Sequence, residues 1–407
     1  MIGVDISNVW CRVSLPEVLG REKEIFEAHS ALAGDNDHGW LTRRIQTEEI
    51  LTAADRLRQN ARTLVVVGVG RAVLGVRGVV RLTTGRRATT PRLLFVGDNV
   101  SAADWEDVLT ALEQTEFSVL ATAPTGNEPE PLIALRALRW VMEKRYGDDR
   151  KNRVVISAPA GSDLARLAET EDYLFLPAQT LPGGADSVLG AGALTLLAAV
   201  GHSPELLLRG GTEQYEICDV RSLENPGWLY AAARYALSQK GRNRELLCLP
   251  NEAEGLGQWW SRTVSGGGIW TSALRLPADL HTVGDALLDG RQNQFVTALR
   301  LPGSGRMTTV ETAWKNPDRL ESLAGRSLDS VEAVMLDAAA RAVGQADVPL
   351  ISVECDEDLT DDKIGQLLYF VEFAAGLQEK LAGGQASPLR GLLGDIDREL
   401  GRNSWKP

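Results

Sequence analysis

Apolar positions in the first half of the chain form short runs that alternate with segments of helical spacing. Between residues 49 and 200, the intervening segments place apolar residues every three or four positions. The runs are TLVVVGVG at 63–70, RLLFVGD at 92–98, FSVLATAP at 117–124, RVVISAP at 153–159 and YLFLPAQ at 173–179. Strands that are apolar on both faces and alternate with helices are typical of a parallel sheet covered on both sides.

A second and less regular series of the same kind follows. Its predicted strands are RELLCLP at 244–250, QFVTALRLP at 294–302 and PLISVECD at 349–356, with helices predicted at 225–241, 279–290, 327–345 and 360–384. We therefore predict an α/β fold with two doubly wound parallel-sheet domains in series, flanked by N- and C-terminal helical segments. The expected boundaries are 1–48 for the N-terminal segment, 49–205 and 206–358 for the two domains, and 359–407 for the C-terminal tail.

Helix-capping residues support two of these elements. Ser101 precedes a helical pattern and has Asp104 three residues later, which is typical of a helix N-terminus. Pro226 stands at the start and Gly241 just after the end of another predicted helix, the positions where each residue type is favoured.

Composition narrows the class of protein. The chain has 407 residues, 44% of them hydrophobic and 24% charged, as in soluble globular proteins of two or three domains. Its formal net charge of -12 disfavours a nucleic-acid partner, which would require a basic face. No apolar run approaches the roughly 20 residues that cross a bilayer, and we see no secretion signal. We expect a cytoplasmic protein that does not bind membranes.

Cysteine and histidine spacing gives no sign of a metal or cofactor. The four cysteines are far apart in the sequence, which predicts buried, reduced thiols. The four histidines are equally scattered and form no HExxH motif. We therefore expect no metal and no cofactor. These residues are Cys11, Cys218, Cys248, Cys355, His29, His38, His202 and His281.

The glycine-rich stretch VVVGVGRAVLGVRGVV at 65–80 follows a predicted strand, as phosphate-binding turns often do. Gly68 and Gly70 match the first two glycines of the dinucleotide fingerprint, but the sixth position is Val73. A valine there prevents the close helix–strand packing that the third glycine allows. A nucleotide-dependent enzyme is therefore the least favoured of the functions considered.

The order of several further segments resembles the phosphoglucose isomerase family, which is built from two sugar-isomerase (SIS-type, flavodoxin-like) domains. The matching segments run from about residue 37 to 383, and their collinearity is more specific than any single motif. They are HGW, GVGRAVLGVR, FSVLATAPTGNEPEP, GGADSVLGAGALTLLAAVG, ENPGWLYAAARYAL, QWWSRTVSGGG, DLHTVGDALLDGRQNQF and IGQLLYFVEFAAGL.

The resemblance implies a homodimeric enzyme of glycolysis and gluconeogenesis that interconverts glucose 6-phosphate and fructose 6-phosphate. The family's phosphate-binding serine–threonine segment corresponds to residues 123–129 here, where Ala123, Asn127, Glu128 and Pro129 replace hydroxyl residues. A sugar-phosphate or other anion site is expected near Thr125 and Asn127. The residues that the resemblance assigns to phosphate or sugar binding are Gly70, Arg71, Thr125, Gly126 and Asn127.

The family's proton-transfer groups are largely absent. No Asp or Glu lies between Glu254 and Asp279, where the catalytic glutamate should follow the tryptophan pair. Ala185 stands in place of the arginine after Gly183 and Gly184, and the C-terminal lysine segment reads ASPLRGLLGDIDREL. His281 alone matches, at the position of the ring-opening histidine, which in the family reaches the neighbouring subunit's site.

Two hypotheses remain open beside the nucleotide-dependent one. The chain is an isomerase with a relocated base, or a non-catalytic member that serves as a phosphosugar-binding regulator, scaffold or partner subunit. Because the base and the oxyanion-stabilising cation are both missing, we expect the family reaction to be weak or lost. Candidates for a relocated base are Glu128, Glu130, Glu252 and Asp285.

Overall fold

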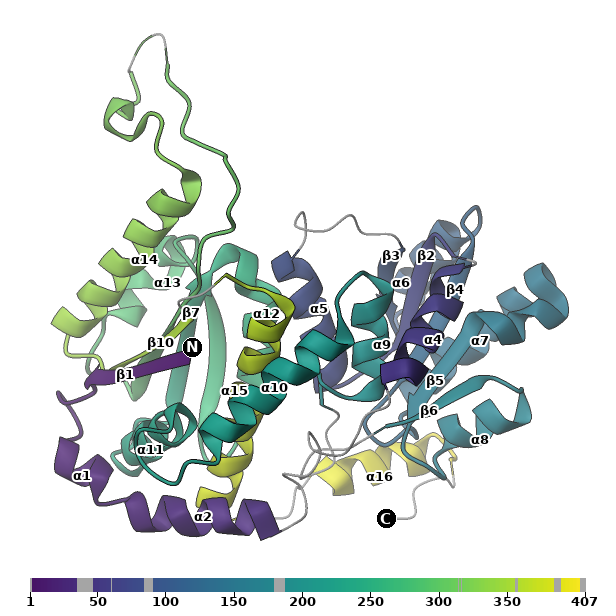
Figure 1. Ribbon diagram of the computed structural model, residues 1–407, viewed down its shortest axis with the longest axis horizontal. Helices are drawn as coiled ribbons and strands as arrows, with labels where there is room; N and C mark the ends of the chain where they lie inside the picture. The colour runs from purple at the N-terminus through teal and green to yellow at the C-terminus, as the bar shows by residue number, and fades with distance from the viewer. Residues whose placement is uncertain are drawn as a thin grey trace. The chain divides into compact units, whose positions relative to one another are not determined.

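The computed structural model describes residues 2–34, 47–59, 61–83, 91–178, 187–313, 315, 317–355, 358–383 and 389–402. The chain forms two compact units that are interleaved in sequence (Figure 1). The 31–213 unit comprises Ala31–Glu213 and Gly384–Pro407, and the 214–383 unit comprises Met1–Ser30 and Gln214–Gly383. The N-terminal segment expected at 1–48 and the tail expected at 359–407 are therefore each divided between the two units.

The 31–213 unit contains a five-stranded sheet in which every strand pair is parallel. Its order, β3-β2-β4-β5-β6, starts in the middle of the sheet, moves to one edge and then returns to build the other side. This is the flavodoxin-like form of the doubly wound fold. The strands are β2 (Thr63–Gly68), β3 (Arg92–Val96), β4 (Phe117–Thr122), β5 (Val154–Ala158) and β6 (Leu174–Pro177).

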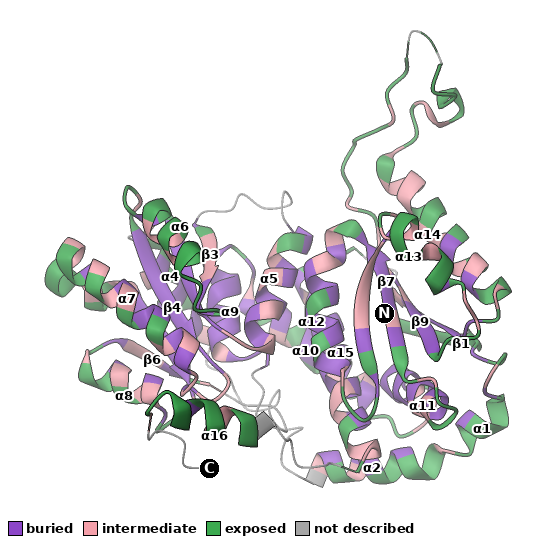
Figure 2. Cartoon of the chain, turned by 180° about the vertical axis from the view of Figure 1, so that it is seen from behind, coloured by how far each residue is buried: buried purple, intermediate pink, exposed green. Residues whose placement is uncertain are grey.

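Helices cover both faces of this sheet, as predicted (Figure 2). Val65 and Val67 face the side on which α6, α7 and α8 pack, and the alternate residues of β2 are also fully buried, on the side of α4, α5 and α9. The helices are α4 (Thr47–Gln59), α5 (Arg71–Thr83), α6 (Ala102–Leu112), α7 (Pro129–Tyr146), η1 (Gly147–Arg153), α8 (Asp163–Thr170), α9 (Ala191–Ala199) and α16 (Leu389–Glu399), and α10 (Pro204–Cys218) leads into the other unit. The predicted N-cap of α6 is confirmed, because Oγ of Ser101 accepts the N–H of Asp104 at 3.4 Å.

The 214–383 unit has a second five-stranded sheet, of order β1-β10-β9-β7-β8. Four strands are parallel, and β1 pairs antiparallel with β10, with Ile2 opposite Cys355. The predicted parallel-sheet fold is confirmed, and the antiparallel strand β1 adds to this edge an element that was not expected in the N-terminal segment. The strands are β1 (Ile2–Asn8), β7 (Arg244–Pro250), β8 (Trp270–Leu276), β9 (Gln294–Arg300) and β10 (Leu350–Cys355), and the sequence did not predict β1 or β8.

The helices of this unit also lie on both faces of its sheet. One face carries α11, α12 and α15, and the other carries α13 and α14. The described residues of the connection between β9 and α14 (301–313, 315 and 317–327) extend away from the sheet as an arm (Figure 1). The helices are α1 (Leu15–Leu19), α2 (Glu22–Gly34), α11 (Pro226–Gln239), η2 (Asn251–Ala253), α12 (Glu254–Val264), α13 (Leu280–Leu287), η3 (Glu321–Leu323), α14 (Leu328–Gln345) and α15 (Asp361–Leu381).

A buried ion pair lies at the centre of the second sheet. Glu245 on β7 and Arg234 on α11 are both fully buried, with Arg234 Nη2 2.9 Å from Glu245 Oε2. The carboxylate also accepts hydrogen bonds from Tyr230 at 2.7 Å, Thr271 at 2.7 Å and Thr297 at 2.6 Å. These donors come from one helix and two neighbouring strands, so the charge ties the layers of the unit together.

The cysteines depart from expectation at one position. Cys218, Cys248 and Cys355 are buried and free, whereas Cys11, in the turn after β1, is exposed. Within the described ranges, no group of three or more His, Cys, Asp and Glu side chains could hold a metal ion. None of the helices described above combines the length and the apolar character needed to cross a membrane.

Candidate functional site

Two loops meet at the carboxyl ends of β2 and β4. These adjacent strands flank the point where the strand order of the sheet reverses, and ligands of doubly wound folds bind at such a point. Gly70 follows β2 with a φ of 96°, and a Cβ atom there would lie 2.6 Å from Cγ of Pro124. Only glycine fits this close approach. The structure thus brings the Gly70–Arg71 turn, at the start of α5, against the loop that begins at Pro124.

The loop after β4 is organised around the carboxylate of Glu128. One carboxylate oxygen accepts the backbone N–H of Thr125 at 2.8 Å, and the other accepts the N–H of Asn127 at 3.1 Å. The Oγ1 of Thr125 accepts the same Asn127 N–H at 3.2 Å. Glu128 is also the N-cap residue of α7, and it is half-buried. Converging backbone N–H groups of a loop attract an anion, and here the anion is the protein's own side chain.

The N-terminus of α8 fixes the shape of this loop. Gly126 has a φ of 72°, and a Cβ atom on it would lie 2.4 Å from Oγ of Ser162. Its carbonyl accepts the N–H of Leu164 at 3.0 Å, and Oδ1 of Asn127 accepts the N–H of Asp163 at 2.8 Å. The Asn127 side chain therefore accepts a hydrogen bond at the N-terminus of α8.

Arg402 also contacts this loop, and no sequence motif pointed to it. Its Nη2 donates to the carbonyl oxygen of Asn127 at 2.9 Å and lies 3.3 Å from Oδ2 of Asp163. The two residues that meet, Asn127 and Arg402, are 275 positions apart in the chain. A local pattern cannot reveal such a contact.

His281 is the second residue of α13 and lies in the 214–383 unit, whereas the loop residues belong to the 31–213 unit. Its side chain is exposed, and no hydrogen bond of its ring is found among the residues that the structure describes. Asp285, four residues further along α13, is also exposed. Residues at this spacing lie on one helix face.

The segment after the tryptophan pair is a tight turn of glycines. Trp259 and Trp260 on α12 are fully buried. Gly267 and Gly268 follow with φ values of 57° and 82°, and a Cβ atom on Gly267 would lie 2.9 Å from Cβ of Ala382. The turn therefore has neither a carboxylate nor room for a side chain at its centre. His38 and Gly183 to Ala185, which belong to other matching segments, lie outside the described residues.

Comparison with known proteins gives one consistent answer. A glucose-6-phosphate isomerase of Clostridium perfringens is 29% identical over 408 residues, covering 93% of this chain and 90% of that protein. A glucose-6-phosphate isomerase of Bacillus cereus is 29% identical over 374 residues, covering 86% and 83%. No protein-family model matches the chain.

The chain is similar to glucose-6-phosphate isomerases along most of its length. Solved structures agree on the fold. A glucose-6-phosphate isomerase from Chlamydia trachomatis superposes with a TM-score of 0.71 at 16% identity, covering 87% of this chain and 73% of that one. A hypothetical protein from Thermus thermophilus superposes with a TM-score of 0.85 at 16% identity, covering 98% and 99%. This chain therefore shares its fold with these two proteins.

Proposed function

We propose that this chain is a member of the glucose-6-phosphate isomerase family in which interconversion of glucose 6-phosphate and fructose 6-phosphate is lost or strongly reduced. The observation that carries the proposal is the carboxylate of Glu128 on the N–H groups of Thr125 and Asn127. A substrate phosphate at this loop would have to displace that carboxylate or lie beside its charge. Two like charges in contact repel by on the order of 4 kcal/mol at a moderate dielectric.

The glycine turn after α12 supports the same proposal. Isomerisation through an enediolate needs a base within hydrogen-bond reach of the carbon-bound proton. The family's carboxylate position falls in the stretch from Ser265 to Ile269, which contains three glycines and no acid. Loss of a positioned base costs about 10²- to 10⁴-fold in rate, and loss of an oxyanion-stabilising group about another 10²- to 10³-fold.

The remaining parts of the proposal follow the family. Gly70, Arg71, Thr125, Gly126 and Asn127 form what remains of the phosphate and sugar site. His281 is exposed, as a residue that acts in a neighbouring subunit's site must be before assembly. We propose a cytoplasmic homodimer without a cofactor, in which a phosphosugar-binding, regulatory or scaffold role replaces catalysis.

The competing hypothesis is an active enzyme with a relocated base. The Glu128 carboxylate is already held by two backbone N–H groups of its own loop. Glu130 lies in the first turn of α7 and Glu252 in η2. Asp285 shares an exposed helix with His281, so this pair is the strongest candidate for substituted chemistry.

A coupled assay of both reaction directions tests the proposal. The protein is prepared from a host that lacks its own glucose-6-phosphate isomerase, because a trace of that enzyme would dominate the rate. We expect turnover at least about 10⁴-fold below that of the Clostridium perfringens relative, assayed side by side.

Substitutions at the candidate residues identify any rate that remains. Turnover close to the relative's, abolished by His281→Ala and by one of Glu128→Gln, Glu130→Gln, Glu252→Gln or Asp285→Asn, would overturn the proposal and name the base. A trace rate that none of these substitutions changes is not produced by the candidate site and leaves the proposal standing.

A further inference from the structure

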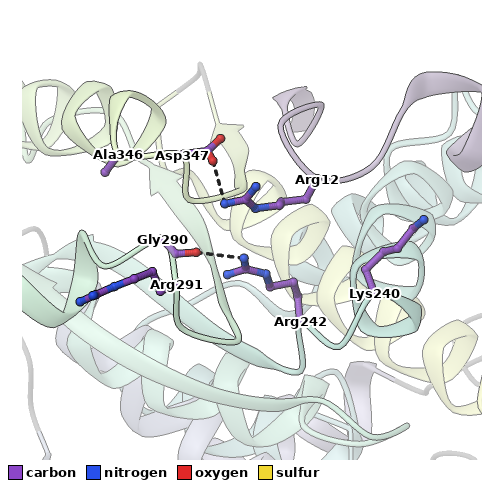
Figure 3. Close-up of a pocket in the computed structure, with 7 residues that line it drawn as sticks. All are labelled: Arg12, Lys240, Arg242, Gly290, Arg291, Ala346 and Asp347. Atoms are coloured by element: carbon purple, nitrogen blue, oxygen red, sulfur yellow. Dashed lines mark hydrogen bonds and ion pairs between the residues drawn. The ribbon is translucent and has the colours of Figure 1, made fainter.

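A cationic pocket lies at the opposite edge of the second sheet from the edge where doubly wound folds bind ligands. It has a volume of about 640 Å³ (Figure 3). Its residues precede the amino ends of β7, β9 and β10 or follow β1. They are Arg12, Lys240, Arg242, Gly290, Arg291, Ala346 and Asp347, all in the 214–383 unit.

Arg242 is the central cation of this pocket. Its Nη2 donates to the carbonyl oxygen of Gly290 at 2.9 Å, and its Nη1 donates to the carbonyl oxygens of Gln292 and, at 3.2 Å, Gln294. These bonds fix the guanidinium but leave its charge without a carboxylate partner among the described residues, and they use three of its five N–H donors. Burial and the neighbouring Arg12 charge lower the pKa of Arg242, while Cys11 and Asp347 act in the opposite direction.

The other cations have carboxylate partners that a ligand can replace. Arg12 lies 2.7 Å from Asp347, and Arg291 lies 2.9 Å from Asp289. Lys240 lies 2.6 Å from Glu17. Asp347 and Glu17 are exposed, and ion pairs between exposed side chains contribute little to stability. In addition, Nε of Arg12 is buried and has no hydrogen-bond partner among the described atoms.

The arrangement of the side chains indicates the kind of ligand. Arg12 and Arg242 lie beside each other and extend in the same direction, toward Asp347 and Gly290, and Arg291 and Lys240 flank this pair with their side chains extended outward (Figure 3). Arginine matches phosphate oxygens in a two-pronged geometry. The volume suits a small molecule. No aromatic side chain is among the lining residues, so a base-stacking contribution is absent from this surface.

We propose that this pocket is a second binding site, for a small polyanion with at least two phosphate groups. One phosphate lies between Arg12 and Arg242, and another is reached by a flanking cation. A local positive site in a chain of net charge -12 gathers such ligands against the overall field of the protein. The site depends on neither the candidate loop after β4 nor the loss of isomerase activity.

Cys11 provides a reporter of occupancy. It is the exposed one of the four cysteines, it adjoins Arg12 in sequence, and its thiol interacts electrostatically with Arg242 and Asp347. A polyanion bound beside Arg12 adds negative charge near the thiol and disfavours its thiolate. We expect inorganic pyrophosphate to slow alkylation of Cys11 by iodoacetamide by at least about fivefold at saturation in low-salt buffer.

Calorimetric titration with pyrophosphate measures the affinity, with orthophosphate and sulfate as single-anion comparisons. Arg242→Gln should raise the pyrophosphate Kd by at least about tenfold, as loss of a charge-assisted contact does. Because Arg242 also holds three carbonyls, the double variant Lys240→Gln/Arg291→Gln serves as a second test, with an expected rise of about threefold or more. The matched control is Arg398→Gln, because Arg398 does not line the pocket. Its side chain is 76% exposed and pairs with Asp395 at 2.9 Å. This resembles Arg291, which is 91% exposed and pairs with Asp289.

Three results would overturn the proposal: no pyrophosphate binding and no protection of Cys11, an equal loss of affinity in the Arg398→Gln control, or orthophosphate binding as tight as pyrophosphate. Protection of Cys11 that disappears in the pocket variants and persists in the control supports it.

Discussion

Glu245 is a residue whose charge is balanced only by the groups packed around it. It is fully buried, and its partner Arg234 is fully buried as well. Breaking such a pair leaves an uncompensated charge in the interior, which typically costs about 3–5 kcal/mol. We expect Glu245→Gln to lower the free energy of unfolding by about that amount, measured by urea denaturation.

The control for this prediction is an exposed ion pair between the neighbouring strands β9 and β10. Arg300 Nη1 lies 3.2 Å from Glu354 Oε1, and both side chains are more than a third exposed. Because water already screens these charges, Glu354→Gln should change the free energy of unfolding by less than about 1 kcal/mol. Equal losses in the two variants would show that burial of the Glu245 pair is not what makes it important.

At the scale of the element, the short helix α1 depends on a carboxylate at its first turn. Glu17 accepts the N–H of Ser14 at 2.8 Å and pairs at 2.6 Å with Lys240, the C-cap residue of α11. The hydrogen bonds from Lys240 and Ser14 lower the pKa of Glu17 from 4.5 to about 2. A pKa lowered in the folded state means that the stabilisation is present above pH 4.5 and is lost as the pH falls toward 2.

Thermal unfolding across this pH window tests the role of Glu17. Wild-type Tm should fall more steeply between pH 4.5 and 2 than the Tm of Glu17→Gln, which has no proton to gain at this position. Glu27→Gln is the comparison, because Glu27 is exposed and its contact with Lys23 is 3.9 Å long. Identical pH profiles for wild type and Glu17→Gln would contradict the assignment.

At the scale of the whole molecule, the arm at 301–327 is the feature that a monomer explains least well. Met307 is 94% exposed, and the base of the arm is held by few backbone contacts, among them the Val310 N–H to the Arg326 carbonyl at 2.9 Å. Long connections without their own core are usually functional. Together with the family resemblance, this favours a dimer in which the arm contacts the partner chain.

Sedimentation equilibrium should therefore give twice the 44.1 kDa mass of the chain. Replacing residues 305–325 with a short glycine–serine linker should give a folded monomer, because the arm contributes little to the core of its own unit. A wild-type monomer at high protein concentration would contradict the dimer, and a dimeric linker variant would show that another surface forms it.

The local pattern was sufficient for the elements that are apolar on both faces. β2, β4 and β5 are continuous apolar runs and are buried along their whole length, so their burial could be predicted from residue type alone. β1 and β8 were missed for a related reason. Each lies at an edge of the second sheet; β1 is exposed at several positions and β8 is half-buried at most of its positions, and partial exposure weakens the apolar signal.

The sequence by itself therefore determined the α/β class, most of the strands, the family resemblance and the absence of an acid in the glycine turn. Only the tertiary structure decided that the Glu128 carboxylate occupies the N–H groups of the loop after β4. It also decided which residues line the proposed polyanion pocket. Glu128 turns back onto its own loop because Gly126 and the start of α8 impose the loop's conformation. Arg12, Lys240 and Arg291 come together because parallel strands align their amino ends at one edge, which brings distant segments of chain into one pocket.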